Sequence, residues 1–181
     1  MKKRHLLICG ERGAGKSTLI RRLLALSTRP LGGFVTLRLK TADENGFYPI
    51  YLYDAALPEG ERCNTKENLA AACDSRSSVR HSEVFDTLGT RCIRSAPENG
   101  LILMDELGFL ESGAHVFQRA VLDALDGEQP VLAAVKPKDT DFLRAVRGHE
   151  NAELVFIDET NRDALYDALA GRILTWNAFR P

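Results

Sequence analysis

A glycine-rich segment near the N-terminus constrains the fold of this chain more than any other feature. Residues 10–17 read Gly-Glu-Arg-Gly-Ala-Gly-Lys-Ser, which matches the phosphate-loop pattern G-x-x-x-x-G-K-[ST]. An apolar run at residues 5–9 precedes the segment, and leucines recur at helical spacing across residues 16–26. A buried strand, a tight turn and a helix are the context that this pattern requires. The segment therefore predicts a polyphosphate-binding loop, and its flanks disfavour the alternative of a chance glycine-rich turn.

Each part of this loop has a role in holding a polyphosphate. The glycines let backbone amides turn inward around the phosphate oxygens, and the following helix points its positive end at the same place. Lys16 supplies a point charge to the β and γ phosphates, and Ser17 offers a hydroxyl to Mg²⁺. We therefore expect these nucleotide-binding residues: Gly10, Gly13, Ala14, Gly15, Lys16, Ser17 and Thr18.

Short apolar runs alternate with helical patterns along the rest of the chain. We expect further strands at residues 101–104, 131–135 and 154–157, and helices at 82–96, 115–125, 141–147 and from 160 to about 173. Two β-prone runs, 34–39 and 47–53, flank an Asp-Glu-Asn-Gly turn and predict an inserted hairpin. Residues 58–82 give a poor signal, with a possible helical turn at 69–73. The pattern predicts one α/β domain over residues 1–181, a three-layer sandwich with a mainly parallel sheet.

Composition and charge set the remaining limits. The chain has 181 residues, of which 44% are hydrophobic and 27% charged, as in an ordinary globular domain. Its 24 Lys and Arg against 25 Asp and Glu give no support for nucleic acid as a partner. No apolar run approaches the roughly 20 residues that cross a bilayer, and the first run is too short for a secretory leader. We therefore expect a cytoplasmic protein with no membrane partner. Its four cysteines lack paired short spacings, so we expect reduced thiols rather than a zinc site.

Two adjacent carboxylates follow the apolar run at 101–104. A phosphate-loop protein places its second metal contact at the end of such a strand, so we expect Asp105 to join Ser17 in holding Mg²⁺. Glu106 can reach a water in line with the γ phosphate and accept its proton, so Lys16 and Glu106 are the candidate catalytic residues. The alternative for Glu106 is a strand-end carboxylate in water. The adjacent pair favours water as the phosphoryl acceptor.

Charge that develops on the transferred phosphoryl group calls for a further cation. The candidates for this cation are Arg12, Arg119, Arg144, Arg147 and Arg162. Most arginines on the helices of an α/β domain are exposed to solvent, so for any single one of them a surface position is the alternative. Arg162 follows the last strand at the sheet edge, where a base could stack on a guanidinium; a surface residue at a helix start is the alternative. Residues 136–139, Lys-Pro-Lys-Asp, are a degenerate version of the guanine-selective N-K-x-D sequence, and we interpret them as a charged loop.

Further sequence elements occur in the order typical of one family. They are Gly32-Gly33-Phe34-Val35-Thr36, Asn45-Gly46-Phe47, Asp105-Glu106-Leu107-Gly108 with Leu110-Glu111 after it, and Asn161-Arg162. Together with the phosphate loop, they make the chain resemble the nucleoside-triphosphatase family first described from thermophiles, whose vertebrate members are called cancer-related nucleoside triphosphatases. The resemblance spans residue 6 to about residue 174. The phosphate loop is widely shared, so the D-E-x-G and G-G-F-x-T elements are what narrow the match.

The resemblance implies a single recombinase-like α/β domain that hydrolyses ATP, GTP and other nucleoside triphosphates with Mg²⁺ and little base preference. A nucleotide-kinase role has also been considered for that family. The chain departs from the family pattern where Leu37 and Arg38 replace an acidic residue, where Glu44 replaces an Arg, and where Leu110 replaces a Met. These changes leave open a divergent subfamily with another partner.

Three functions remain open from the sequence. The first is Mg²⁺-dependent hydrolysis of nucleoside triphosphates, with ATP or GTP as substrate. The second is phosphoryl transfer to a nucleotide or small metabolite, for which only the arginines between residues 76 and 80 hint at a lid. The third is a nucleotide-dependent switch or adaptor that binds a protein partner when loaded.

Overall fold

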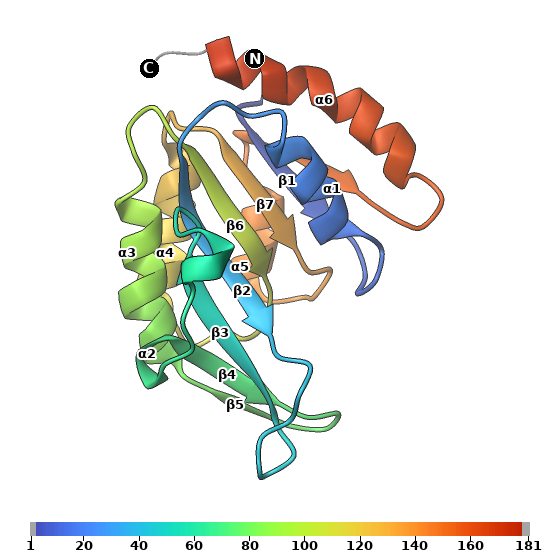
Figure 1. Ribbon diagram of the computed structural model, residues 1–181. Helices are drawn as coiled ribbons and strands as arrows, with labels where there is room; N and C mark the ends of the chain where they lie inside the picture. The colour runs from blue at the N-terminus through green and yellow to red at the C-terminus, as the bar shows by residue number, and fades with distance from the viewer. Residues whose placement is uncertain (1–2, 179–181) are drawn as a thin grey trace.

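A single mixed sheet forms the centre of the described part of the chain. The computed structural model describes residues 3–178, and its eight strands follow the order β5-β4-β3-β2-β6-β7-β1-β8 (Figure 1). The strands are β1 His5–Cys9, β2 Leu31–Arg38, β3 Tyr48–Asp54, β4 Leu69–Cys73, β5 Ser78–Arg80, β6 Leu101–Leu107, β7 Val131–Val135 and β8 Ala152–Phe156. The helices are α1 Lys16–Leu24, α2 Ser82–Val84, α3 Thr90–Arg94, α4 His115–Asp126, α5 Asp141–Arg147 and α6 Arg162–Ala178, with short 3-10 helices η1 Glu59–Glu61 and η2 Lys66–Asn68.

The larger part of the sheet is parallel, as the sequence predicts. Strands β2, β6, β7, β1 and β8 pair in parallel, and β7 separates β1 from β6. In β1, Leu6 and Ile8 pack with α1 and α6 on one face, whereas Leu7 packs with α4 and α5 on the other. Such strands read as continuous apolar runs because both of their faces are covered. The helices therefore lie in layers on either side of the sheet (Figure 1), as in the predicted three-layer sandwich.

The predicted hairpin is present as β2 and β3, and two further antiparallel strands, β4 and β5, extend it. Phe34 to Arg38 of β2 pair antiparallel with β3, and the Oδ1 atom of Asp43 accepts bonds from Asn45 N–H and Phe47 N–H, both at 2.9 Å, in the turn. Strands β4 and β5 then continue the sheet beyond β3. The possible helical turn at 69–73 was therefore wrong. This alanine-rich run forms β4 because its pairing with β3 and its burial override a weak local preference.

A helix with an internal π turn covers the region where the insertion meets the parallel strands. The helix expected over residues 82–96 comprises α2, the π-helical segment Phe85–Gly89 and α3. Phe85 and Phe34 each contact Phe117 of α4 edge to face, with ring centroids 5.4 and 5.2 Å apart. A Cβ atom on Gly89 would lie 2.9 Å from the Phe117 ring, so this close approach requires a glycine. The aromatic cluster fixes the insertion against the parallel half of the sheet.

The remaining predicted elements lie close to where the sequence places them. Strand β6 extends past the expected residue 104 to Leu107, and β8 begins two residues earlier than expected. Helix α5 begins after Thr140, whose hydroxyl accepts a bond from Leu143 N–H at 3.2 Å as an N-cap. Within residues 3–178, no helix is both long and apolar enough to span a bilayer.

Candidate functional site

The phosphate loop has the backbone geometry that its sequence predicts. It joins the end of β1 to the start of α1, and Gly13 and Gly15 adopt φ angles of +87° and +98°, which L side chains rarely adopt. A Cβ atom on Gly10 would lie 2.5 Å from the carbonyl oxygen of Ile157. Gly13 and Gly15 are therefore needed for the turn itself, whereas Gly10 is needed for close packing against Ile157, the residue after β8.

Lys16 lies across the inside of this loop. Its Nζ atom donates hydrogen bonds to the carbonyl oxygens of Gly10 at 2.6 Å and Glu11 at 2.9 Å, and the residue is only 6% exposed. Ser17 and Thr18 follow in the first turn of α1 and are exposed. The loop thus presents one ammonium group and, beside it, free hydroxyls.

Asp105 and Glu106 lie at an irregularity in β6. Successive side chains of a regular strand point to opposite faces, which would separate these two carboxylates. Between β6 and β7, however, Met104 pairs with Ala133 and Leu107 pairs with Val135, so that two residues of β6 oppose one of β7. A bulge of this kind re-aims side chains. As a result, Asp105 and Glu106 line the same cavity.

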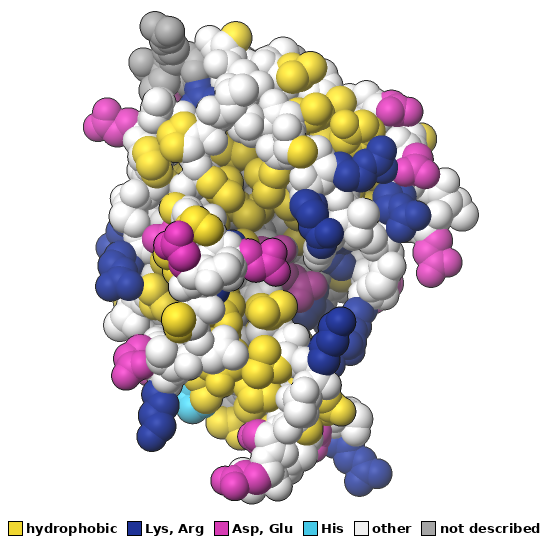
Figure 2. Space-filling view, in the orientation of Figure 1, with side chains coloured by type: hydrophobic (Ala, Val, Ile, Leu, Met, Phe, Trp, Pro, Cys, Tyr) yellow, Lys and Arg dark blue, Asp and Glu magenta, His cyan; other side chains and the backbone are white. Residues whose placement is uncertain are grey.

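This cavity brings the phosphate loop and the carboxylates together. It has a volume of about 370 Å³ and opens on a face where acidic and basic side chains surround a hollow (Figure 2). Polar and charged residues from β1 to β7 contribute to its wall: Arg12, Ser17, Thr36, Arg38, Asp74, Asp105, Glu106, Glu111 and Lys136. Ser17 and Asp105, the expected Mg²⁺ contacts, therefore line the same cavity.

Asp105 is held by the strand next to it. Its Oδ2 atom accepts a hydrogen bond from the backbone N–H of Thr36, at 3.3 Å, in the G-G-F-x-T segment of β2. Burial raises the pKa of Asp105 above its ordinary value, and the Thr36 N–H opposes that rise. A cation beside a carboxylate favours its ionised form, so a buried carboxylate of this kind is suited to binding one.

Glu106 forms an ion pair that the sequence analysis missed. Its Oε2 atom lies 3.0 Å from Nζ of Lys136, and the two side chains are 36% and 25% exposed. Residues 136–139 follow β7, and we expected a charged loop there. The available signal for this ion pair was a Lys that directly follows a buried strand. It could not be used, because the sequence does not show that this strand, β7, lies beside β6, which carries the carboxylates.

Glu111 is a second residue of this cavity to which the sequence pattern assigned no role. It is 2% exposed, and its Oε1 atom accepts a hydrogen bond from the N–H of Gly108. Burial raises the pKa of Glu111 to about 7, against the opposing effects of the Gly108 N–H and of Lys136. The Leu110-Glu111 part of the family pattern was the only sequence signal for it.

Of the five arginine candidates, Arg162 and Arg12 lie near the phosphate loop. A Cβ atom on Gly15 would lie 2.7 Å from Cδ of Arg162, so the Arg162 side chain lies against the loop. Arg12 belongs to the loop and lines the cavity.

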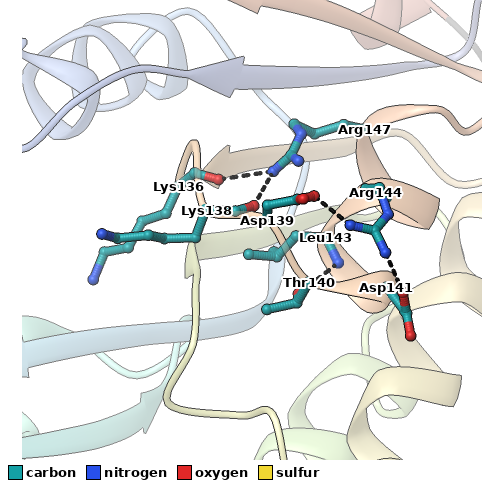
Figure 3. A network of polar contacts seen from close by, with 8 residues as sticks. All are labelled: Lys136, Lys138, Asp139, Thr140, Asp141, Leu143, Arg144 and Arg147. Atoms are coloured by element: carbon teal, nitrogen blue, oxygen red, sulfur yellow. Dashed lines mark hydrogen bonds and ion pairs between the residues drawn. The ribbon is translucent and has the colours of Figure 1, made fainter.

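The other three arginines are engaged elsewhere. Arg119 pairs with Asp123, whereas Arg144 pairs with Asp139 and Asp141 (Figure 3). Arg147 donates to the carbonyl oxygens of Lys136 and Lys138, at 3.1 and 2.7 Å (Figure 3). Arg144 and Arg147 therefore organise the loop after β7.

Comparison with known proteins agrees with this geometry. Curated relatives named nucleoside-triphosphatase THEP1 include one from Thermotoga maritima, which is 26% identical and matches over 91% of this chain and 92% of its own length. Another, from Thermofilum pendens, is 28% identical over 96% and 97% of the two chains.

Two solved structures share the fold. The crystal structure of THEP1 from Aquifex aeolicus aligns with a TM-score of 0.71 at 20% identity, covering 93% of this chain and 98% of that one. The solution structure of a human cancer-related nucleoside triphosphatase aligns with a TM-score of 0.66 at 21% identity, covering 95% and 98%. The model of a family described as NTPase matches residues 5–170. Because that match covers most of the sequence, the chain belongs to the NTPase family.

Proposed function

We propose that this protein, an NTPase by family, hydrolyses nucleoside triphosphates to diphosphate and phosphate with Mg²⁺ and with little base preference. One observation carries the proposal: Ser17, next to the phosphate-loop lysine, lines the same cavity as Asp105 and Glu106. The names of the curated relatives support the same reaction class.

The phosphate loop binds and orients the triphosphate. Backbone amides of residues 10–17 turn toward the phosphate oxygens, and Lys16 exchanges its bonds to two backbone carbonyls for contacts with the β and γ phosphates. Its ammonium group then lies where negative charge gathers as the terminal phosphoryl group leaves.

Ser17 and Asp105 fit a magnesium ion that is shared with the substrate. Mg²⁺ prefers oxygen ligands and is usually held by one or two carboxylates together with substrate phosphates and waters. One hydroxyl and one carboxylate in a common cavity match that donor set. When bound, Mg²⁺ would neutralise charge on the β and γ phosphate oxygens.

Glu106 acts on the attacking water. Its carboxylate accepts the proton of a water whose oxygen bonds to the γ phosphorus, while the bond from that phosphorus to the β–γ bridging oxygen breaks. The diphosphate leaves with the bridging oxygen. Glu106 lies at the cavity wall and is partly exposed, so a water can reach it.

Arg162 explains a weak base preference. Its side chain lies against Gly15 of the phosphate loop, and a guanidinium can stack on any base. Stacking does not read the hydrogen-bonding edge of the base, so this contact accepts purines and pyrimidines alike.

The test is the variant Glu106→Gln, which keeps the shape of the side chain but cannot accept the proton. We expect triphosphate binding, measured by calorimetry, to be retained and phosphate release to fall about a hundredfold. Glu98→Gln is the matched control, because Glu98 is exposed and precedes β6, at the opposite end of that strand from Glu106. Phosphate release at the parent rate in Glu106→Gln would show that Glu106 is not the base.

A second candidate function is phosphoryl transfer to a small acceptor. The cavity extends past the phosphate loop to the antiparallel part of the sheet, where Arg38 and Asp74 line it and could contact an acceptor. A panel of labelled triphosphates with and without nucleoside monophosphates separates the two functions. Phosphate release without any acceptor supports hydrolysis, whereas label that appears only on the acceptor supports transfer.

A further inference from the structure

Lys136 forms an ion pair with Glu106, the carboxylate that we assign as the general base. The ion pair between its Nζ atom and Oε2 of Glu106 measures 3.0 Å and lies at the wall of the cavity, where β6 and β7 end side by side. Neither side chain is fully exposed, so the pair is screened less than a surface pair.

The backbone of Lys136 is fixed on both sides. Its N–H donates to the carbonyl oxygen of Leu107 at 2.8 Å, just past the bulge that carries Glu106. Its own carbonyl oxygen accepts a bond from Arg147 of α5, which also binds the carbonyl oxygen of Lys138 (Figure 3). The side chain of Lys136 therefore starts from a defined position relative to Glu106.

The stem and head of Lys136 are also guided. A Cβ atom on Gly108 would lie 2.9 Å from Cδ of Lys136, so the stem passes over a glycine that leaves it room. The Nζ atom lies 5.4 Å from the centroid of the Phe109 ring, within reach of a cation–π contact. Together these contacts direct the ammonium group to the Glu106 carboxylate.

We propose that Lys136 is a positioning residue that holds the Glu106 carboxylate in the orientation from which it activates water. The bulge turns Glu106 toward the cavity, and the ion pair with Lys136 then restricts the rotamers of this partly exposed side chain. This proposal rests on the assignment of Glu106 as the base, because Lys136 acts through that carboxylate and not on the substrate.

The first test uses Lys136→Met, which keeps most of the stem over Gly108 and removes the charge. We expect kcat to fall about tenfold, less than the roughly hundredfold loss on removal of the base, with KM for ATP changed by less than about twofold. Lys136→Arg should recover most of the lost rate because it restores the ion pair. Lys138→Met, an exposed lysine on the same loop, is the matched control and should keep the parent kcat. Parent kcat in Lys136→Met would overturn the proposal.

A double-mutant cycle distinguishes positioning from direct action. If Lys136 works through Glu106, Lys136→Met should change the residual rate of Glu106→Gln by less than about twofold. A full tenfold further loss in that background would overturn the proposal, because Lys136 would then act on the phosphoryl group or on the fold. If Glu106→Gln alone keeps the parent rate, the assignment of the base fails, and that result is separate from the behaviour of Lys136.

Discussion

Glu111 gives the protein a pH-dependent stability that a single substitution should remove. The side chain is 2% exposed, and burial raises its pKa to about 7 from the ordinary value of 4.5. At a pH between these two values, Glu111 is therefore protonated in the folded state and ionised in the unfolded state. Stability from this group is fully present below about pH 4.5 and is lost as the pH rises through about 7.

The size of this effect follows from the two pKa values. Their difference corresponds to about 3 kcal/mol at 1.36 kcal/mol per pKa unit, most of which falls between about pH 5 and about pH 8. Glu111→Gln has the same shape, does not ionise, and can still accept the hydrogen bond from Gly108 N–H. The free energy of unfolding of the variant minus that of the parent should therefore be about 2 to 3 kcal/mol larger at about pH 8 than at about pH 5.

Urea unfolding of both proteins at the two pH values measures this difference directly. At each pH, the free energy of unfolding of the parent is subtracted from that of the variant, and the two results are compared. This comparison cancels any pH-independent effect of the amide. Glu98→Gln, the same change at an exposed position, serves as the control for replacing a carboxylate by an amide. If Glu111→Gln and the parent lose or gain stability in parallel from about pH 5 to about pH 8, Glu111 does not carry a raised pKa and the reasoning fails.

Three further substitutions test the site and the core. Lys16→Ala should abolish triphosphate binding or turnover, because its ammonium group lies inside the loop; unchanged phosphate release would reject the site. Gly33→Ala should destabilise the protein by about 3 kcal/mol in urea, since Gly33 has φ +88° and a Cβ atom would lie 2.0 Å from the Leu103 carbonyl oxygen; a parent-like midpoint would contradict this. Phe117→Ala should cost about 3 to 5 kcal/mol, measured in the same way, because it empties the centre of the aromatic cluster; a loss below about 1 kcal/mol would show that the cluster does not hold the insertion.

Local sequence was sufficient to predict the phosphate loop and the parallel part of the sheet. The loop follows from glycines that permit positive φ angles, a property of the residue that needs no distant partner. The parallel strands were predictable because strands covered on both faces are continuously apolar, and the helices because their apolar residues recur at helical spacing. Asp105 and Glu106 were identifiable since they end such an apolar run.

Other features depended on contacts between distant segments. Residues 69–73 became β4 only because β3 offered an edge to pair with, and their alanines carry little strand preference of their own. The hairpin signal likewise gave no indication that two more strands would extend it.

The arrangement of the site also depended on contacts between distant segments. The groups present could be read from residue type alone: a phosphate loop, two adjacent carboxylates and several cations. The pairing of Glu106 with Lys136 depends on the strand order and on the bulge in β6, and the burial of Glu111 depends on the fold around it. Side-chain type is a local property, whereas the partner and the solvent exposure of a charge depend on chain segments far apart in sequence.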